Sequence, residues 1–163
     1  MPVSTRAVTP ASTSGTQSPS FPISVQAALY VAALSVEAGR TPSGRPVASL
    51  AVLDHTCRYV ATGTGPCDPQ PIPAAVQREV LAAASALLPV RFVADKARAG
   101  TSPVAGRDVI VVTFGPSTIT GETAQLPVQI YCGFNCIQGG TLVLTADHGR
   151  WKVTGNTGAA YLS

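Results

Sequence analysis

Hydrophobic residues recur at helical spacing in two segments of the chain. Between Ser24 and Gly39, four apolar residues fall on one face of a helical wheel: Val25, Leu29, Ala32 and Val36. Between Pro73 and Pro89, four more do the same: Val76, Val80, Ala83 and Leu87. Ser24 suits an N-cap, Gly39 a C-terminal stop, and Pro73 the first turn of a helix. The spacing therefore predicts helices over residues 25–38 and 73–88.

Apolar runs of strand length occupy much of the remaining chain. Val47 to Leu53 is continuously apolar except for one serine, and we expect this strand to continue to Tyr59. Residues 125–132 alternate between polar and apolar side chains, which indicates a strand with one solvent-facing side. Residues 147–149 (Asp-His-Gly) predict a hairpin turn. Further strands are expected at 90–93, 108–114, 141–145, 150–154 and 157–162.

The order of these elements predicts an α+β fold. The two helices come early and most strands come late, which favours a curved antiparallel sheet with two helices packed on one face. Cystatin-like and NTF2-like folds share this plan, and they serve here as an analogy for architecture only. Residues 1–23 are rich in Ser, Thr and Pro and lack periodicity. We therefore expect a disordered arm over 1–23 and a single α+β domain over 24–163.

The charge of the chain narrows the classes of partner. Only 12% of the 163 residues are charged, and the net charge is +3. These charges are scattered, whereas a nucleic-acid-binding surface needs clustered basic residues, so we expect no nucleic-acid partner. No apolar run approaches the ~20 residues of a membrane-spanning helix, so we also expect no membrane span.

The four cysteines allow three pairings. We favour the local pairing, Cys57 with Cys67 and Cys132 with Cys136, because each pair flanks a glycine-containing loop or turn. An even number of cysteines around turns suits an oxidising compartment. Four buried, reduced thiols are the alternative. Zinc is less favoured, because neither C-x9-C nor C-x3-C matches the usual C-x2-C spacing, and we expect no metal and no cofactor.

The compartment follows from the cysteines rather than from a signal segment. The first twenty residues contain no apolar stretch of the kind that a secretory signal needs. We expect an extracytoplasmic protein (secreted, periplasmic or surface-anchored) whose signal would have preceded Met1. A cytoplasmic protein with reduced thiols is the alternative.

Three short motifs follow one another near the C-terminus: YCGFNC at 131–136, GGTLVL at 139–144 and GRWKV at 149–153. This succession resembles the ending of uncharacterised bacterial secreted proteins and lipoproteins. The resemblance implies an extracytoplasmic α+β domain of bacterial origin. It implies no activity.

Both histidines follow an aspartate: His55 follows Asp54, and His148 follows Asp147. Imidazole suits acid–base chemistry near neutral pH. Neighbours on a strand point to opposite faces, so we expect Asp54 not to orient His55 directly. The first strand turns polar at Asp54, which we expect to be the most buried acid and to be hydrogen-bonded or ion-paired. Asp54, His55 and Tyr59 are the candidate pocket residues, whereas His148 is expected in a turn.

No set of residues forms a recognisable catalytic constellation, so the sequence favours a protein without catalytic activity. The predicted function is a non-enzymatic extracytoplasmic binding or accessory domain, stabilised by disulfides, whose partner is an unidentified protein or small molecule. The alternative is a small ligand-binding or hydrolytic pocket of a curved-sheet fold that uses Asp54 and His55. A deep pocket lined by Asp54 or His55 would favour this alternative.

Overall fold

The computed structural model describes residues 23–58, 66–102, 105–133 and 135–162, with side chains up to residue 157. Within these ranges the helices are α1 (Val25–Ala38), α2 (Ala74–Ala84) and α3 (Lys96–Ala99). The strands are β1 (Val47–Leu53), β2 (His55–Thr56), β3 (Gln70–Pro71), β4 (Val90–Val93), β5 (Asp108–Phe114), β6 (Thr118–Thr120), β7 (Thr123–Tyr131), β8 (Ile137–Asp147) and β9 (Arg150–Leu162). The predicted arm lies outside the described residues except for Ile23.

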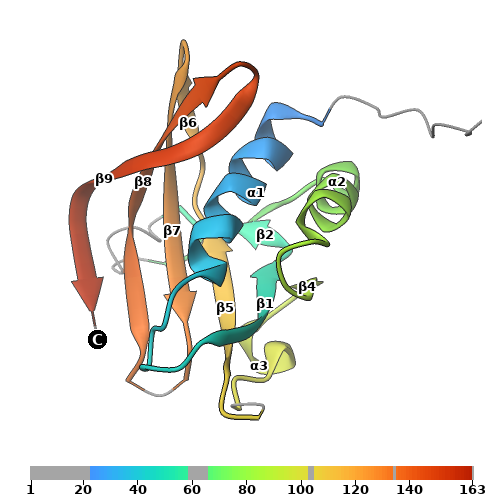
Figure 1. The fold of residues 1–163 in the computed structure, drawn as a ribbon, viewed down its shortest axis with the longest axis vertical. Coiled ribbons are helices and arrows are strands. Elements are labelled where there is room, and N and C mark those ends of the chain that lie inside the picture. Colours follow the sequence, from blue (N-terminus) through green and yellow to red (C-terminus); the bar gives the residue numbers. More distant parts are fainter. Residues whose placement is uncertain (1–22, 59–65, 103–104, 134, 163) are drawn as a thin grey trace, which may run out of the picture.

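Most of the strands form one sheet in the order β4-β1-β5-β7-β8-β9, with β6 paired to β7 (Figure 1). Strand β1 is parallel to both β4 and β5, whereas the pairs β5–β7, β6–β7, β7–β8 and β8–β9 are antiparallel. The short strands β2 and β3 pair with each other outside this sheet. The chain is therefore an α+β protein, as predicted, built on a mixed sheet.

The expectation of a wholly antiparallel sheet is wrong for its β4-β1-β5 part. Parallel neighbours need a long crossover connection. Helix α2 lies on the connection from β1 to β4, and α3 lies between β4 and β5. The analogy with cystatin-like and NTF2-like folds is not confirmed by this topology. The strand expected to reach Tyr59 ends at Leu53, because the chain bends at Asp54.

Helices α1 and α2 lie on one face of the sheet, as expected (Figure 1). They contact each other, and the main core lies between them and the sheet. In this core Tyr30 of α1 stacks on Phe114 of β5, with ring centroids 4.3 Å apart. The other face carries a smaller cluster of buried residues in which Ala99 of α3 covers β1, β4 and β5: Ala51, Leu53, Val93, Ala99 and Val111. Both faces of the parallel strands are therefore covered, as buried parallel strands require.

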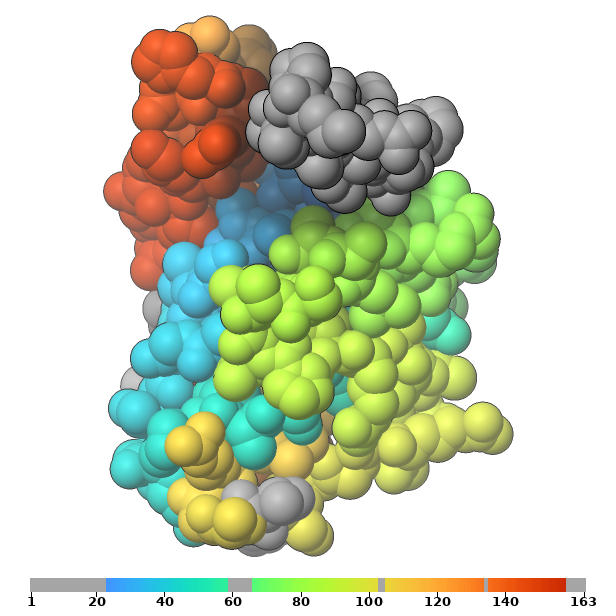
Figure 2. All heavy atoms as spheres, turned by 45° about the vertical axis from the view of Figure 1, so that its right-hand side comes forward, coloured from blue at the N-terminus to red at the C-terminus, as the bar shows by residue number. Residues whose placement is uncertain are grey.

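The N-terminus of α1 is joined to α2 by one carboxylate. Ser24 caps α1, because its side chain accepts a hydrogen bond from the Ala27 amide. Glu79 of α2 accepts hydrogen bonds from the amide and the hydroxyl of Ser24, at 3.0 and 2.5 Å. These hydrogen bonds lower the pKa of Glu79 below its usual value. Figure 2 shows α2 and the segment after it, in green, packed beside α1, in blue.

The structure contains both predicted disulfides, Cys57–Cys67 and Cys132–Cys136. All four cysteines are thus paired and none is free. Paired cysteines fit a secreted or other extracytoplasmic protein. None of the helices in the described ranges is long and apolar enough to cross a membrane.

Candidate functional site

The predicted pair Asp54 and His55 lies at the bend between β1 and β2. His55 Nδ1 is 2.8 Å from Asp54 Oδ1. The expectation that Asp54 cannot orient His55 is wrong, because the alternation of side chains applies only within a continuous strand. The bend at Asp54 interrupts the strand and turns both side chains toward each other.

Asp54 is paired, as expected, but it is not the most buried acid. Its side chain is 42% exposed, whereas the Glu37 and Asp108 side chains are each 2% exposed. The third candidate, Tyr59, lies outside the described residues. The structure therefore brings Asp54 and His55 together at a partly open surface.

The Cys57–Cys67 disulfide lies beside His55. A ring nitrogen of His55 and both sulfur atoms are within 4.8 Å of one another. His55 and Cys57 are partly buried, and Cys67 is exposed. The backbone around them is held by hydrogen bonds from Cys57 N to Phe114 O and from Ile72 N to Asp54 O, both 2.8 Å.

The second aspartate–histidine pair has the turn role that the sequence predicts. Asp147 and His148 belong to the β8–β9 turn, and the His148 side chain is 96% exposed. Asp147 Oδ1 is 2.5 Å from His148 Nδ1, and Asp147 Oδ2 accepts a hydrogen bond from Lys152 at 3.0 Å. The hydrogen bonds from Lys152 and His148 lower the pKa of Asp147. This pair lies on a different element from the Asp54–His55 pair.

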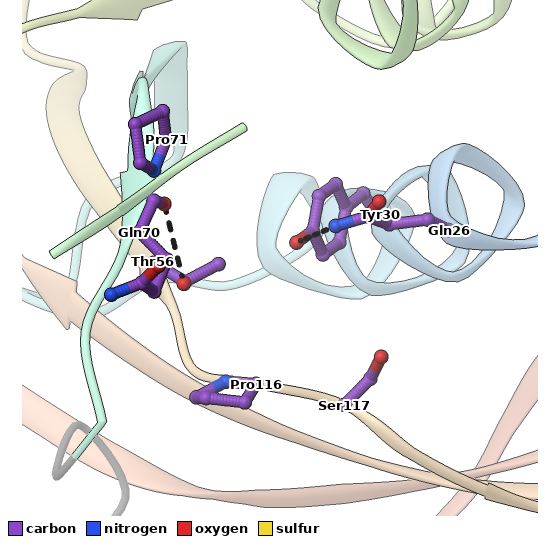
Figure 3. Close-up of a pocket in the computed structure, with 7 residues that line it drawn as sticks. All are labelled: Gln26, Tyr30, Thr56, Gln70, Pro71, Pro116 and Ser117. Carbon is purple, nitrogen blue, oxygen red and sulfur yellow. Dashed lines mark hydrogen bonds between the residues drawn. The ribbon is translucent and has the colours of Figure 1, made fainter. Parts of the chain in front are cut away.

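A depression of about 380 Å³ opens between α1, the β2–β3 pair and the segment after β5. Figure 3 shows Gln26 and Tyr30 of α1 across from Thr56, Gln70 and Pro71, with Pro116 and Ser117 from the β5–β6 connection below them in this view. Neither Asp54 nor His55 belongs to its lining. The depression is therefore distinct from the site that the sequence predicts.

The lining of this depression combines polar and apolar groups and carries no charge. Gln26 Nε2 donates a hydrogen bond to the Tyr30 hydroxyl at 2.9 Å, and the Thr56 hydroxyl donates one to Gln70 O at 3.4 Å. Burial raises the pKa of Tyr30, partly offset by the hydrogen bond from Gln26, so its phenol is neutral at physiological pH. The depression thus offers hydrogen-bond donors and acceptors without a charge.

Sequence reasoning missed this depression. One signal was available, because Gln26 and Tyr30 are four residues apart and therefore share one face of the predicted helix. Thr56, Gln70 and Ser117 carried no signal of their own, since they come together only through the β2–β3 pairing and the chain path after β5.

A second depression, of about 450 Å³, is mainly apolar and lies at the C-terminal end of α2. Its lining is formed by α2 and the chain up to β4: Leu81, Ser85, Leu87, Leu88, Pro89 and Val90. It also lacks Asp54 and His55. It offers one side-chain hydroxyl, that of Ser85, and no ionisable group.

The two most buried acids serve the framework. Asp108 accepts hydrogen bonds from the Ser43 hydroxyl and, at 3.0 Å, from Arg45 Nε, which fixes the connection before β1 to the start of β5. Burial alone would raise the pKa of Asp108, but these hydrogen bonds and the charge of Arg45 outweigh it and lower the pKa. Glu37 lies in the last turn of α1, facing the core.

Comparison with known proteins assigns no function to these sites. No family model matches the chain, and no curated protein or solved structure matches it either. The functional conclusion therefore depends on the geometry described above.

Proposed function

We propose that the chain is a non-enzymatic extracytoplasmic binding domain, stabilised by two disulfides, that takes a small neutral ligand in the depression between α1 and β2–β3. The observation that carries this proposal is the lining of the depression, which combines apolar surface with a few polar groups and has no group charged at neutral pH. Ligand pockets commonly combine apolar walls with a few polar groups that orient the ligand. Pro71 and Pro116 supply apolar surface here, and Gln26 supplies an orienting amide.

The two disulfides support the extracytoplasmic location in this proposal. Both close short loops, of sequence separation 10 and 4. Such cross-links persist where the environment is oxidising and stabilise small exported domains. The pairing of every cysteine also removes the thiol as a nucleophile.

The proposal is tested by mapping small molecules on the protein by NMR. A library of neutral and charged fragments is added to ¹⁵N-labelled protein, and shifts are followed at Gln26, Thr56, Gln70 and Ser117. We expect the hits to be neutral compounds that shift these signals. A hydrogen bond is worth about 1 kcal/mol, so Gln26→Ala should weaken binding of the best fragment about fivefold.

Gln125→Ala is the matched control, because Gln125 is exposed on β7 and does not line the depression. It should leave fragment affinity unchanged. Hits that are mainly charged, or that shift Asp54 and His55 instead, would contradict the proposal.

The 2.8 Å contact between Asp54 and His55 favours a second candidate, a hydrolytic site. In that function the carboxylate would orient the imidazole, which would then act as a general base toward water. The measurement is turnover of a panel of activated esters by the wild type and by His55→Ala. Our first candidate predicts equal background rates for both proteins, and a rate lost only in His55→Ala would favour the hydrolytic site.

A further inference from the structure

We propose that the Cys57–Cys67 disulfide conceals a metal site, in which the reduced thiolates and His55 bind Zn²⁺. A ring nitrogen of His55 and the two sulfur atoms already lie within 4.8 Å of one another. Zn–S bonds of about 2.3 Å and Zn–N bonds of about 2.0 Å place tetrahedral ligand atoms about 3.5–3.8 Å apart. Reduction frees the two sulfur atoms to separate, and the proposal requires the Cys57, Cys67 and His55 side chains to rotate to these separations.

Asp54 gives this cluster the partner that metal-binding histidines usually have. Its Oδ1 lies 2.8 Å from His55 Nδ1, so the carboxylate favours the tautomer with the proton on Nδ1. The lone pair is then on Nε2 and is available to a metal ion. Carboxylate–histidine–zinc arrangements of this kind orient the ring and increase the basicity of the ligand.

The His55 and Cys57 side of the cluster is held by backbone contacts that do not involve the disulfide. His55 is in β2 and is paired with Pro71 of β3, and Cys57 follows β2 directly. Backbone hydrogen bonds from Cys57 to Phe114 and from Ile72 to Asp54 hold this segment on both sides. The Cα atoms of Cys57 and Cys67 are 4.7 Å apart, so the unusual C-x9-C spacing still brings the two thiols together.

The exposure of Cys67 allows a reductant to reach the bond. A dithiol supplies two electrons and two protons: its own sulfurs are oxidised to a disulfide, and the Cys57–Cys67 bond is cleaved to two thiols. Zn²⁺ then displaces both thiol protons and binds two thiolates and a neutral imidazole. The resulting centre carries no net charge, and water completes its fourth position. A disulfide of the dithiol class reverses the step: it accepts two electrons and is reduced to two thiolates, while the Cys57–Cys67 bond re-forms and the ion is released, so the redox state controls metal binding.

The test uses Co²⁺ as a spectroscopic probe and Zn²⁺ as its competitor. Protein reduced with dithiothreitol is desalted without oxygen and titrated with Co²⁺, and folding is followed by circular dichroism. We expect one ion per chain with thiolate-to-cobalt absorption, displaced by Zn²⁺, and no binding to unreduced protein. Loss of the carboxylate partner, tested with Asp54→Asn, should weaken binding about 10- to 100-fold, and loss of the ligand itself, tested with His55→Ala, should weaken it at least as much.

The second disulfide supplies the matched control. Cys132→Ser/Cys136→Ser should retain the cobalt signal, and Cys57→Ser/Cys67→Ser should lose it. Three results would overturn the proposal: binding that survives Cys57→Ser/Cys67→Ser, affinity unchanged in His55→Ala, or no cobalt binding by the reduced wild type. A reduced wild type that unfolds and does not refold on addition of Zn²⁺ would also overturn it.

Discussion

Glu37 is a buried acid whose ionisation opposes folding. It is 1% exposed, and burial raises its pKa to about 7, although the nearby charge of Arg40 acts in the opposite direction. Arg40 Nε lies 2.8 Å from Glu37 Oε2, yet no donor among the described residues is aligned to hydrogen-bond that oxygen. The folded state therefore binds the Glu37 proton more tightly than the unfolded chain does.

Glu37→Gln should stabilise the protein at alkaline pH. Because the folded-state pKa is raised, the stability that protonated Glu37 contributes is complete below about pH 4.5 and is lost as the pH rises through about 7. A shift of this size corresponds to roughly 3 kcal/mol. Urea unfolding should therefore show Glu37→Gln more stable than wild type by up to about this amount at pH 8.5, and similar to it at pH 4. Equal stability at pH 8.5 would show that Glu37 ionises freely in the folded state.

Asp108 has the opposite pH dependence. Hydrogen bonds from Ser43 and Arg45 lower its pKa, so the stability that it contributes is present above pH 4 and is lost as the pH falls below it. Asp108→Asn removes the charge that Ser43 and Arg45 hydrogen-bond; because the Arg45 side chain is 46% exposed, the loss should be only about 1–2 kcal/mol at pH 7. Urea unfolding at pH 7 and pH 3 checks this, because the difference in unfolding free energy between Asp108→Asn and wild type should be smaller at pH 3. A constant difference would assign the effect to packing alone.

The sequence identified Asp54 and His55 as candidate site residues but did not predict that their side chains contact each other. In a strand that continued to Tyr59 the two side chains would point to opposite faces, but the chain bends at Asp54. Burial of single acids was equally hard to predict. Asp108 is buried because Ser43 and Arg45, far away in sequence, meet it across the start of β1.

Among the elements, α1 was predicted with its correct ends but with only part of its buried face. Leu29 is buried, as expected. Val25 and Val36 are 49% and 37% exposed, whereas Tyr30 and Glu37 are each 1% exposed. The helix contacts β1, α2 and β9, so it is covered from several directions at once. The spacing of apolar residues predicts one narrow buried stripe along the helix, and it cannot predict that a polar residue such as Glu37 is buried by packing.

The β8–β9 turn illustrates local structure that the sequence does determine. His148 and Gly149 have φ values of 49° and 75°, and positive φ at both central positions is the pattern of a type I′ turn. A Cβ atom at Gly149 would contact nothing within 4 Å, so a substitution there would lower stability only through the strain of its positive φ.

Gly149→Ala should accordingly destabilise the protein by about 1 kcal/mol, because residues other than glycine adopt positive φ at a cost. His148→Asn is the matched change, since Asn-Gly is the preferred pair in this turn, and it should be neutral or stabilising by a few tenths of a kcal/mol. Thermal or urea unfolding distinguishes them. Equal stability of Gly149→Ala and wild type would mean that the turn readily adopts another conformation.

For the whole molecule, sequence patterns gave the class but not the topology. They identified an α+β protein with two helices on one face, because periodicity reports which residues are buried. They could not show that β1 lies between β4 and β5 with all three strands parallel, since a continuous apolar run fits either direction of pairing. The neutral depression depends on the β2–β3 pairing and on the chain path after β5, which no sequence pattern predicted.

The proposal of an extracytoplasmic binding domain requires all four cysteines to be joined in local disulfides. Thiol titration of the native, unreduced protein, repeated after unfolding and followed by mass-spectrometric mapping, tests it most directly. We expect no reactive thiol in the native or the unfolded protein, and peptides linked as Cys57–Cys67 and Cys132–Cys136. Free thiols after unfolding, or a peptide that joins Cys57 or Cys67 to the C-terminal pair, would contradict it.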